Sequence, residues 1–345
     1  RDALSIELLS ARLQAKRAEG QSTLFTLDTL ALELQGQGRY DEAEPLFREA
    51  LEVAREILGD RHPNTLIVIN NLGLLLKAKD NFAAAEPLLH EALGVQRETL
   101  GNRHSDTLIS INNLGHLLHA KGDPAAAELL YREALEARRE TLGGRHPSTL
   151  CSMNNLGALL KVKGDLAAAE PLYREALEGQ RKTLGNRHPD TLISINNLGH
   201  LLHMKGDHTA AELLYRETLK VRRETLGIRH PETLISINNL GHLLHMKGDP
   251  AAAELLYREA LEARRETLGD RHSSTLDSIH SLGVLLSNKG DLAAAEPLYN
   301  EAVEGLRQTL GVHHPDTLAA TKRLALLEDD LVSGRLAAFV ATLSL

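Results

Sequence analysis

Apolar residues along this chain recur three and four positions apart, which is the pattern of amphipathic helices. Between the turns at Gly101 and Gly122, the apolar face consists of Leu108, Ile111, Leu114, Gly115 and Leu118. Between Gly122 and Gly143, it consists of Ala127, Leu130, Tyr131, Ala134 and Leu135. No stretch alternates apolar and polar residues as a half-buried strand would, so the pattern predicts an all-α fold.

The turns between these helices carry matching signals. In the tripeptide K-G-D, Gly122 supplies the left-handed position that ends a helix, and Asp123 is placed to cap the next one. Pro124 then occupies the first helical turn, where its missing N–H is harmless. Gly143 ends the second helix, and Pro147 opens the following first helix. The predicted building unit is therefore a pair of helices joined by short turns.

This unit repeats at a fixed interval. Glycines in an L-G context stand 42 residues apart, at positions 59, 101, 143, 185, 227, 269 and 311. Such a period predicts a stack of helical repeats. We assign seven units to residues 21–62, 63–104, 105–146, 147–188, 189–230, 231–272 and 273–314. Residues 1–20 are expected to be an N-terminal helix left from an earlier repeat, and residues 315–345 a partial eighth repeat with a C-terminal capping helix.

Small residues recur where helices must approach closely. The middle of every second helix is alanine: Ala43, Ala85, Ala127, Ala169, Ala211, Ala253 and Ala295. The first helices carry glycine after a leucine, at Gly73, Gly115, Gly157, Gly199, Gly241 and Gly283. A glycine inside a helix costs about 1 kcal/mol relative to alanine, so its recurrence predicts close packing. Five tyrosines share one second-helix position and are predicted to be core residues: Tyr131, Tyr173, Tyr215, Tyr257 and Tyr299.

Composition narrows the classes of function. The formal net charge of -8 argues against binding nucleic acid through a basic surface. A single cysteine, Cys151, excludes an internal disulfide framework and favours a reducing, cytoplasmic location. No apolar run approaches the roughly 20 residues of a membrane span, so no membrane insertion is expected. The chain begins at Arg1 without a signal-peptide pattern, which favours a fragment of a longer protein.

The repeat resembles the tetratricopeptide repeat, because L-G stands on the first helix and alanine, tyrosine or phenylalanine, and alanine follow on the second. The usual unit has 34 residues. The 42-residue form, with H-P between units and N-N-L-G inside them, is similar to kinesin light chain and nephrocystin-3-like proteins, over about residues 21–332. The resemblance implies a right-handed superhelical α-solenoid of stacked antiparallel helix pairs, with the first helices lining a concave groove.

On that inner face, repeats 2–6 carry amides, imidazoles, lysines and apolar residues but no Asp or Glu, although the whole chain is acidic. Asparagine can both donate to and accept from a peptide backbone. The second asparagine of each pair also matches the groove asparagine with which tetratricopeptide domains hold peptides, so the implied partner is a protein segment with acidic residues. In the alternative, the asparagines organise contacts between units. The predicted groove consists of Asn70, Asn71, Lys77, Asn112, Asn113, His116, His119, Asn154, Asn155, Lys161, Asn196, Asn197, His200, His203, Asn238, Asn239, His242 and His245.

The stretch ISINNLGHLLH occurs three times and puts paired histidines on this face. Metal binding by imidazoles of consecutive repeats is one hypothesis, but no Cys or carboxylate ligand lies near, and we predict no metal site. A pH-sensitive groove is a second hypothesis, and a polar, hydrogen-bonding lining is the one we favour. The histidines of the R-H-P turns are predicted to be loop and capping residues: His62, His146, His188 and His230.

No nucleophile–base arrangement, phosphate-binding glycine loop or metal motif is present in the sequence, so we expect a chain that is not an enzyme and needs no cofactor. The leading hypothesis is a protein–protein interaction scaffold, a kinesin light chain-like adaptor that holds a peptide segment of a partner or cargo. The alternative is the sensory or autoinhibitory repeat arm of a larger signalling enzyme or ATPase. A motor or signalling complex would then be reached through regions outside this chain. A purely structural spacer is the third hypothesis.

Overall fold

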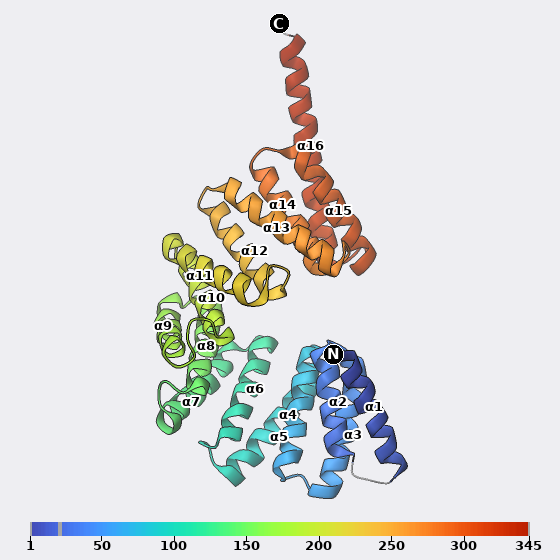
Figure 1. Ribbon diagram of the computed structural model, residues 1–345, viewed down its shortest axis with the longest axis vertical. Coiled ribbons are helices and arrows are strands. Elements are labelled where there is room, and N and C mark those ends of the chain that lie inside the picture. Colours follow the sequence, from blue (N-terminus) through green and yellow to red (C-terminus); the bar gives the residue numbers. More distant parts are fainter. Residues whose placement is uncertain (1, 20–22, 344–345) are drawn as a thin grey trace. The chain divides into compact units, whose positions relative to one another are not determined.

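The computed structural model describes residues 2–19 and 23–343, and every regular element in these ranges is an α-helix (Figure 1). The predictions made for residues 1, 20–22 and 344–345 lie outside the described residues. The first helices of the pairs are α2 (Leu24–Gly36), α4 (Pro63–Ala78), α6 (Ser105–Lys121), α8 (Pro147–Val162), α10 (Pro189–Met204), α12 (Pro231–Met246) and α14 (Ser273–Asn288). The second helices are α3 (Tyr40–Leu58), α5 (Phe82–Leu100), α7 (Pro124–Leu142), α9 (Leu166–Thr183), α11 (His208–Leu226), α13 (Pro250–Leu268) and α15 (Leu292–Leu310). The helices α1 (Asp2–Ala18) and α16 (Pro315–Leu343) flank them, and the all-α prediction is confirmed.

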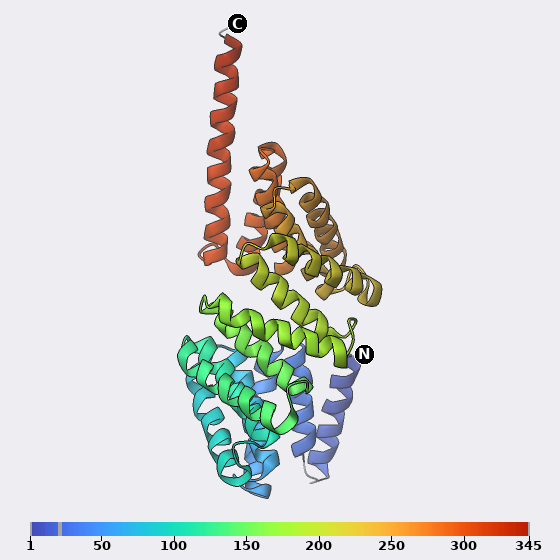
Figure 2. The same cartoon turned by 90° about the vertical axis from the view of Figure 1, so that its left-hand side faces the viewer.

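The chain divides into two compact units, one ending at Thr183 and one beginning at Leu184. In the first unit the helices lie side by side as antiparallel hairpins (Figure 2). Helix α4 contacts both α2 and α6, whereas the second helices α3, α5 and α7 make no comparable contact with one another in the described part of the chain. The first helices therefore form the more closely packed layer of this unit.

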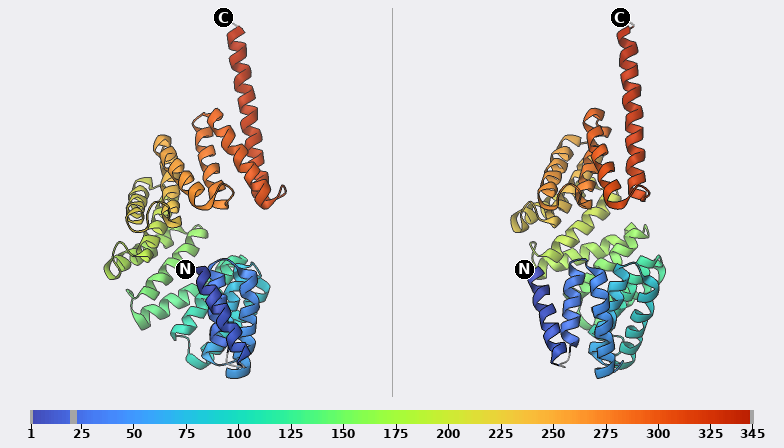
Figure 3. Two further views of the ribbon diagram at one scale, coloured as in Figure 1. Left: turned by 45° about the vertical axis from the view of Figure 1, so that its right-hand side comes forward. Right: turned by 90° about the vertical axis from the view of Figure 1, so that its right-hand side faces the viewer.

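In the second unit the hairpins follow the same order, from α10 to α15, and α16 packs on α15. The residues predicted to form a partial eighth repeat and a C-terminal capping helix belong to α16, one continuous helix of 29 residues. Its C-terminal half extends beyond α15 (Figure 3).

The turn chemistry is as predicted. Gly122 adopts the left-handed conformation, with φ 93° and ψ 20°, and ends α6. Asp123 then accepts a hydrogen bond from the backbone N–H of Ala126 at 3.0 Å and caps α7. Each R-H-P histidine caps the first helix that follows it. The Nδ1 of His62, for example, accepts from the backbone N–H of Asn64 at 3.1 Å.

The repeated small residues bring the two helices of a pair into close contact. All seven second-helix alanines are fully buried, and the five core tyrosines are at most 5% exposed, as predicted. A Cβ atom added to Gly115 would lie 2.7 Å from Cε1 of Tyr131, so no side chain fits there without a shift. Leu130, which we expected in the core, is only partly buried.

Acidic residues of the second helices are paired across repeats. Lys79 at the end of α4 lies 2.7 Å from Glu44 on α3, and Arg97 on α5 lies 2.7 Å from Glu133 on α7. In the second unit, Arg265 on α13 lies 2.6 Å from Glu301 on α15. Exposed ion pairs contribute roughly 0.2–1 kcal/mol each. Their repetition nevertheless places many of the negative charges on the second helices beside basic residues, while Asp106, Asp190 and Glu232 lie in the first turns of first helices.

Candidate functional site

The first asparagine of each pair lies between neighbouring first helices of the first unit. Asn70 donates to the hydroxyl of Ser110 on α6 at 2.8 Å and to the backbone carbonyl of Leu66 at 3.0 Å. It is 7% exposed, and its equivalents Asn112 and Asn154 are 8% and 9% exposed. Asn70 thus joins α4 to α6, in agreement with the alternative in which asparagines organise the repeats, and Asn112 and Asn154 are buried to the same degree.

The second asparagine of each pair is partly exposed and also bonds across repeats. Asn113 donates to the side-chain oxygen of Asn70 at 3.4 Å, and Asn239 donates to that of Asn196 at 3.1 Å. Asn71 donates to the carboxylate of Asp28 at 3.0 Å. The partly exposed members of the predicted set, which keep amide surface for a ligand, are Asn71, Asn113, Asn155, Asn196, Asn197, Asn238 and Asn239.

His116 is turned toward α7 instead of toward solvent. Its Nδ1 lies 2.8 Å from the hydroxyl of Tyr131, and the rings meet edge to face. Burial, with smaller contributions from Lys77 and His119, lowers the pKa of His116 to about 4. This imidazole is therefore neutral at neutral pH. His119, one turn later on α6, is also half-buried, and its Nδ1 has no hydrogen-bond partner.

In the second unit, three histidines gather at the turn between α10 and α11. Nδ1 of His203 lies 3.1 Å from Nδ1 of His208, and the ring of His203 meets that of His242 edge to face at 5.4 Å. Burial lowers the pKa of both His203 and His242, and neighbouring imidazoles add to the effect. Across the described residues, no group of three or more His, Cys, Asp or Glu side chains is placed to hold a metal ion.

The remaining predicted residues border the same first-helix surface. Lys77 and Lys161 are half-buried, and burial lowers the pKa of Lys161. His200 and His242 are exposed. Nε2 of His245 accepts a hydrogen bond from the amide of Asn288 at 3.0 Å, so that imidazole links α12 to α14.

Four of the predicted residues meet at one small cavity between α6 and α8. Its volume is about 130 Å³. Its walls are His116, His119, Tyr131, Asn155, Ala158, Leu159, Lys161 and Val162. No carboxylate lines it, so the cavity offers an ammonium group, an amide and imidazoles to a ligand.

The predicted set omits a row of exposed apolar side chains beside the asparagines. Phe25 is 73% exposed, Ile67 47% and Ile109 51%, and the last two each follow a buried leucine. Leu24, Phe25, Asp28, Leu58, Asn64, Ile67 and Val68 line a second cavity of about 390 Å³. The sequence signal was available, because this position also holds Cys151, Ile193, Ile235 and Asp277 in later repeats, a mixture that is unusual for a core position.

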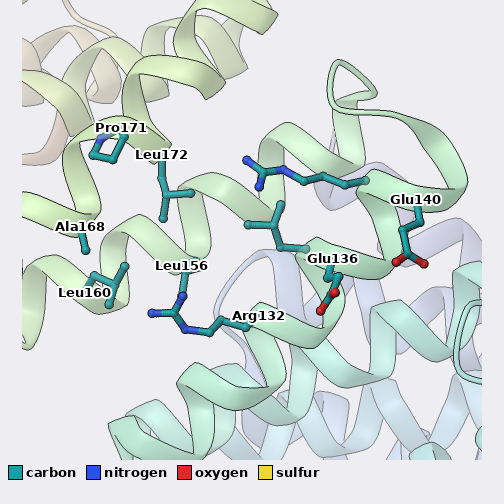
Figure 4. A pocket seen from close by; sticks show the side chains of 10 residues that line it. Arg132, Glu136, Glu140, Leu156, Leu160, Ala168, Pro171 and Leu172 are labelled. Atoms are coloured by element: carbon teal, nitrogen blue, oxygen red, sulfur yellow. The ribbon is translucent and has the colours of Figure 1, made fainter.

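A third cavity, of about 480 Å³, lies on the opposite side, among α7, α8 and α9 (Figure 4). Leu156 and Leu160 of α8 line it together with Ala168, Pro171 and Leu172 of α9 (Figure 4). Its charged rim takes part in an ion pair of the same kind as those between the second helices, since Arg139 lies 2.7 Å from Glu175. We interpret this cavity as a crease between consecutive hairpins.

Comparison with known families identifies the repeat. The tetratricopeptide repeat model matches residues 22–97, 66–140, 130–182, 148–224 and 214–266, and a second tetratricopeptide repeat model matches residues 275–316. No curated protein sequence matches the chain. In the described residues, no helix is long and apolar enough to cross a membrane.

Solved structures with the same architecture include kinesin light chain-like proteins. A candidate kinesin light chain of nearly identical TPR-like repeats from Podosopora anserina is 25% identical, with a TM-score of 0.55 over 60% of this chain and 98% of that one. BtubC (BKLC) from P. vanneervenii is 23% identical, with a TM-score of 0.57 over 69% of this chain and 93% of that one. The apo form of RapI shares the fold at 12% identity, with a TM-score of 0.59 over 83% of this chain and 98% of that one.

Proposed function

Because the chain belongs to the tetratricopeptide repeat family, we propose that it is a protein–protein interaction scaffold whose first-helix face holds a segment of a partner protein that carries acidic residues. The first-helix face is the exposed surface of α4, α6 and α8 in the first unit; α10 and α12 carry an equivalent surface of their own in the second unit. In this proposal the chain is an adaptor of the kinesin light chain-like type. The partner is defined by its chemistry, an acidic segment with some apolar residues.

The separation of charges between the two helix layers carries this proposal. The inner positions of repeats 2–6 hold amides, imidazoles, Lys77 and Lys161, without a carboxylate. The acidic side chains of the second helices face basic residues of the neighbouring repeat, as Glu133 faces Arg97 at 2.7 Å. A chain of net charge -8 thus keeps these inner positions of repeats 2–6 free of carboxylates, and the first helices carry theirs in the first turn, as at Asp106. Such complementarity favours an acidic partner and disfavours a basic one.

The exposed apolar row supports the same surface. Phe25, Ile67 and Ile109 are exposed beside the asparagines, and neighbouring apolar and amide groups suit a peptide whose side chains alternate in character. Buried apolar contacts contribute most of the binding free energy at protein interfaces, while polar groups fix orientation.

The proposal is tested with fluorescein-labelled 15-residue peptide pools that are either acidic or basic and otherwise matched in composition. We expect acidic pools to bind wild-type chain, more weakly at high salt because screening shortens the range of the attraction. Lys77→Glu is expected to weaken binding about fivefold, since one screened charge contact contributes roughly 1 kcal/mol. Fluorescence anisotropy at two salt concentrations measures both effects.

Lys220→Glu is the matched control, because Lys220 is an exposed lysine on the second helix α11. Its affinity for the acidic pool should stay within twofold of wild type. Equal binding of acidic and basic pools, or equal losses in both variants, would contradict the assignment of the first-helix face.

A further inference from the structure

Repeat 4 lacks an inner-face imidazole that repeats 3, 5 and 6 carry. In the 42-residue register, Ala158 occupies the place of an imidazole that other repeats carry as His116, His200 and His242. In repeat 3 that imidazole contacts the hydroxyl of Tyr131, 2.8 Å from its Nδ1. The corresponding tyrosine of repeat 4, Tyr173, faces only a methyl group at this position.

The ring of Tyr173 has the same placement as that of Tyr131. A Cβ atom added to Gly157 would lie 3.0 Å from Cε1 of Tyr173, and one added to Gly115 would lie 2.7 Å from Cε1 of Tyr131. The ring of Tyr173 therefore lies against Gly157, the residue before Ala158. Tyr173 is fully buried, and its hydroxyl oxygen has no hydrogen-bond partner. A buried hydroxyl is unfavourable in that state, so this position is not explained by the stability of the repeat.

The same alanine forms a wall of the cavity between α6 and α8. At about 130 Å³, this cavity is smaller than the roughly 300–1,000 Å³ of sites for drug-sized ligands, and it suits one side chain. A histidine at position 158 would place its imidazole ring at this wall and fill part of the cavity. The alanine thus leaves the cavity open where repeats 3, 5 and 6 place a ring.

The groups around the cavity favour an anion. Lys161 is half-buried, and burial lowers the pKa of its ammonium group, which a carboxylate would compensate. Nδ1 of His119 is buried without a hydrogen-bond partner and can donate to a carboxylate in its Nδ1–H tautomer. Asn155 adds an amide at the same wall. Hydrogen bonds in which one partner is charged are stronger than those between two neutral groups.

We propose that the cavity between α6 and α8 binds the carboxylate of a single Asp or Glu side chain of the partner segment. This inference rests on the proposed function, and it names the residue of the partner that the first unit selects. Lys161 pairs with the carboxylate, while His119 and Asn155 donate hydrogen bonds to it. Ala158 is the specificity-determining residue, because its small side chain admits the ligand. The cavity fixes which repeat faces the acidic residue of the segment.

The test uses a probe that needs no knowledge of the partner. N-acetyl-glutamate N-methylamide presents one carboxylate, and N-acetyl-glutamine N-methylamide is the matched carboxamide. Titration into the whole chain at pH 7.5 is followed through the imidazole Cε1–H signals of His116 and His119, which histidine substitutions assign. We expect saturable shifts with the carboxylate and at least tenfold weaker binding of the carboxamide.

Ala158→His is the decisive variant. It fills the cavity and gives Tyr173 the partner that Tyr131 already has, so its thermal midpoint should equal or exceed that of wild type. We expect at least tenfold weaker carboxylate binding by Ala158→His and by Lys161→Gln. Val284→His is the control, because it adds the same ring at the equivalent position of repeat 7. It should leave the titration unchanged.

The outcomes separate this inference from the proposed function. Unchanged carboxylate binding in a folded Ala158→His chain, or equal binding of carboxamide, overturns the inference. If acidic peptide pools bind wild type and Ala158→His equally well, the proposed function stands and the inference fails. If the carboxylate probe binds as expected while no peptide pool binds, the cavity assignment stands and the proposed peptide-binding function fails.

Discussion

At the scale of single residues, neighbouring residues of the same type make different contacts. His116 and His119 are three residues apart, yet one contacts Tyr131 and the other has a buried Nδ1 without a partner. Asn70 and Asn71 are adjacent, yet the first joins α4 to α6 and the second reaches Asp28 on α2. Burial raises the pKa of that aspartate, and the hydrogen bond from Asn71 partly offsets the shift. Chemical type was therefore readable from the sequence, and the partner of each side chain was not.

The pH dependence of stability belongs to this scale. Burial holds the pKa of His116 at about 4, below its ordinary value of 6.5, so between those values the unfolded chain binds a proton that the folded chain does not. The stability contributed by the neutral imidazole is fully present above pH 6.5 and is lost as pH falls toward 4. His116→Ala should reduce the loss between pH 7.5 and 5.0 by about 1–2 kcal/mol.

Urea unfolding followed by circular dichroism at both pH values measures this difference. Tyr131→Phe is the control, because it removes the hydrogen bond and keeps the imidazole buried. It should retain the pH dependence of wild type. An equal pH dependence in wild type and His116→Ala would show that burial does not shift this group.

At the scale of the elements, the helix pair is held by small residues against large ones. The recurring glycines of the first helices were predicted to mark close packing, and Gly199 confirms it, since an added Cβ would lie 2.8 Å from Cε1 of Tyr215. Gly283 differs: an added Cβ would lie 3.4 Å from Cε1 of Tyr299, which is ordinary contact. In the sequence both glycines occupy the same position of the repeat, and only the distances to the facing tyrosine show that their packing differs.

This difference predicts opposite effects of the same substitution. Gly199→Ala should lower stability by about 1–3 kcal/mol, because the methyl group overpacks the tyrosine. Gly283→Ala should raise it by up to about 1 kcal/mol, because alanine is the better helix former and has room. Both sites lie in the second unit, and thermal unfolding of each variant compares them directly. Two changes of the same sign would contradict the packing argument.

At the scale of the whole chain, contacts are local. Within the described residues of each unit, every pair of helices in substantial contact is adjacent or next but one in the chain. The ion pairs follow the same rule, since Arg55 reaches Glu91 at 2.6 Å and Lys121 reaches Glu86 at 2.6 Å. Stability of such a chain is close to a sum of repeat and neighbour terms.

Unfolding is therefore expected to be less cooperative than in a single globular domain. The van't Hoff enthalpy from the width of the thermal transition should fall below the calorimetric enthalpy, because repeats unfold in more than one step. Differential scanning calorimetry gives both quantities from one experiment. Equal van't Hoff and calorimetric enthalpies would show that all described repeats unfold together, and this result would contradict the expected loss of cooperativity.

The sequence by itself determined the repeat, the helix pair and its turns. Gly122, Asp123 and the R-H-P histidines act locally, within a few residues, and local backbone preferences are sufficient to specify them. The charge separation between first and second helices was also readable, since it follows from the repeat register.

Only the tertiary structure decided which polar groups meet. The contact of His116 with Tyr131 and that of Asn113 with Asn70 join residues 15 and 43 positions apart. They depend on how two helices are rotated against each other, which no local pattern fixes. The unpartnered hydroxyl of Tyr173 became visible for the same reason, because the loss of one imidazole at Ala158 matters only when the ring facing it is known.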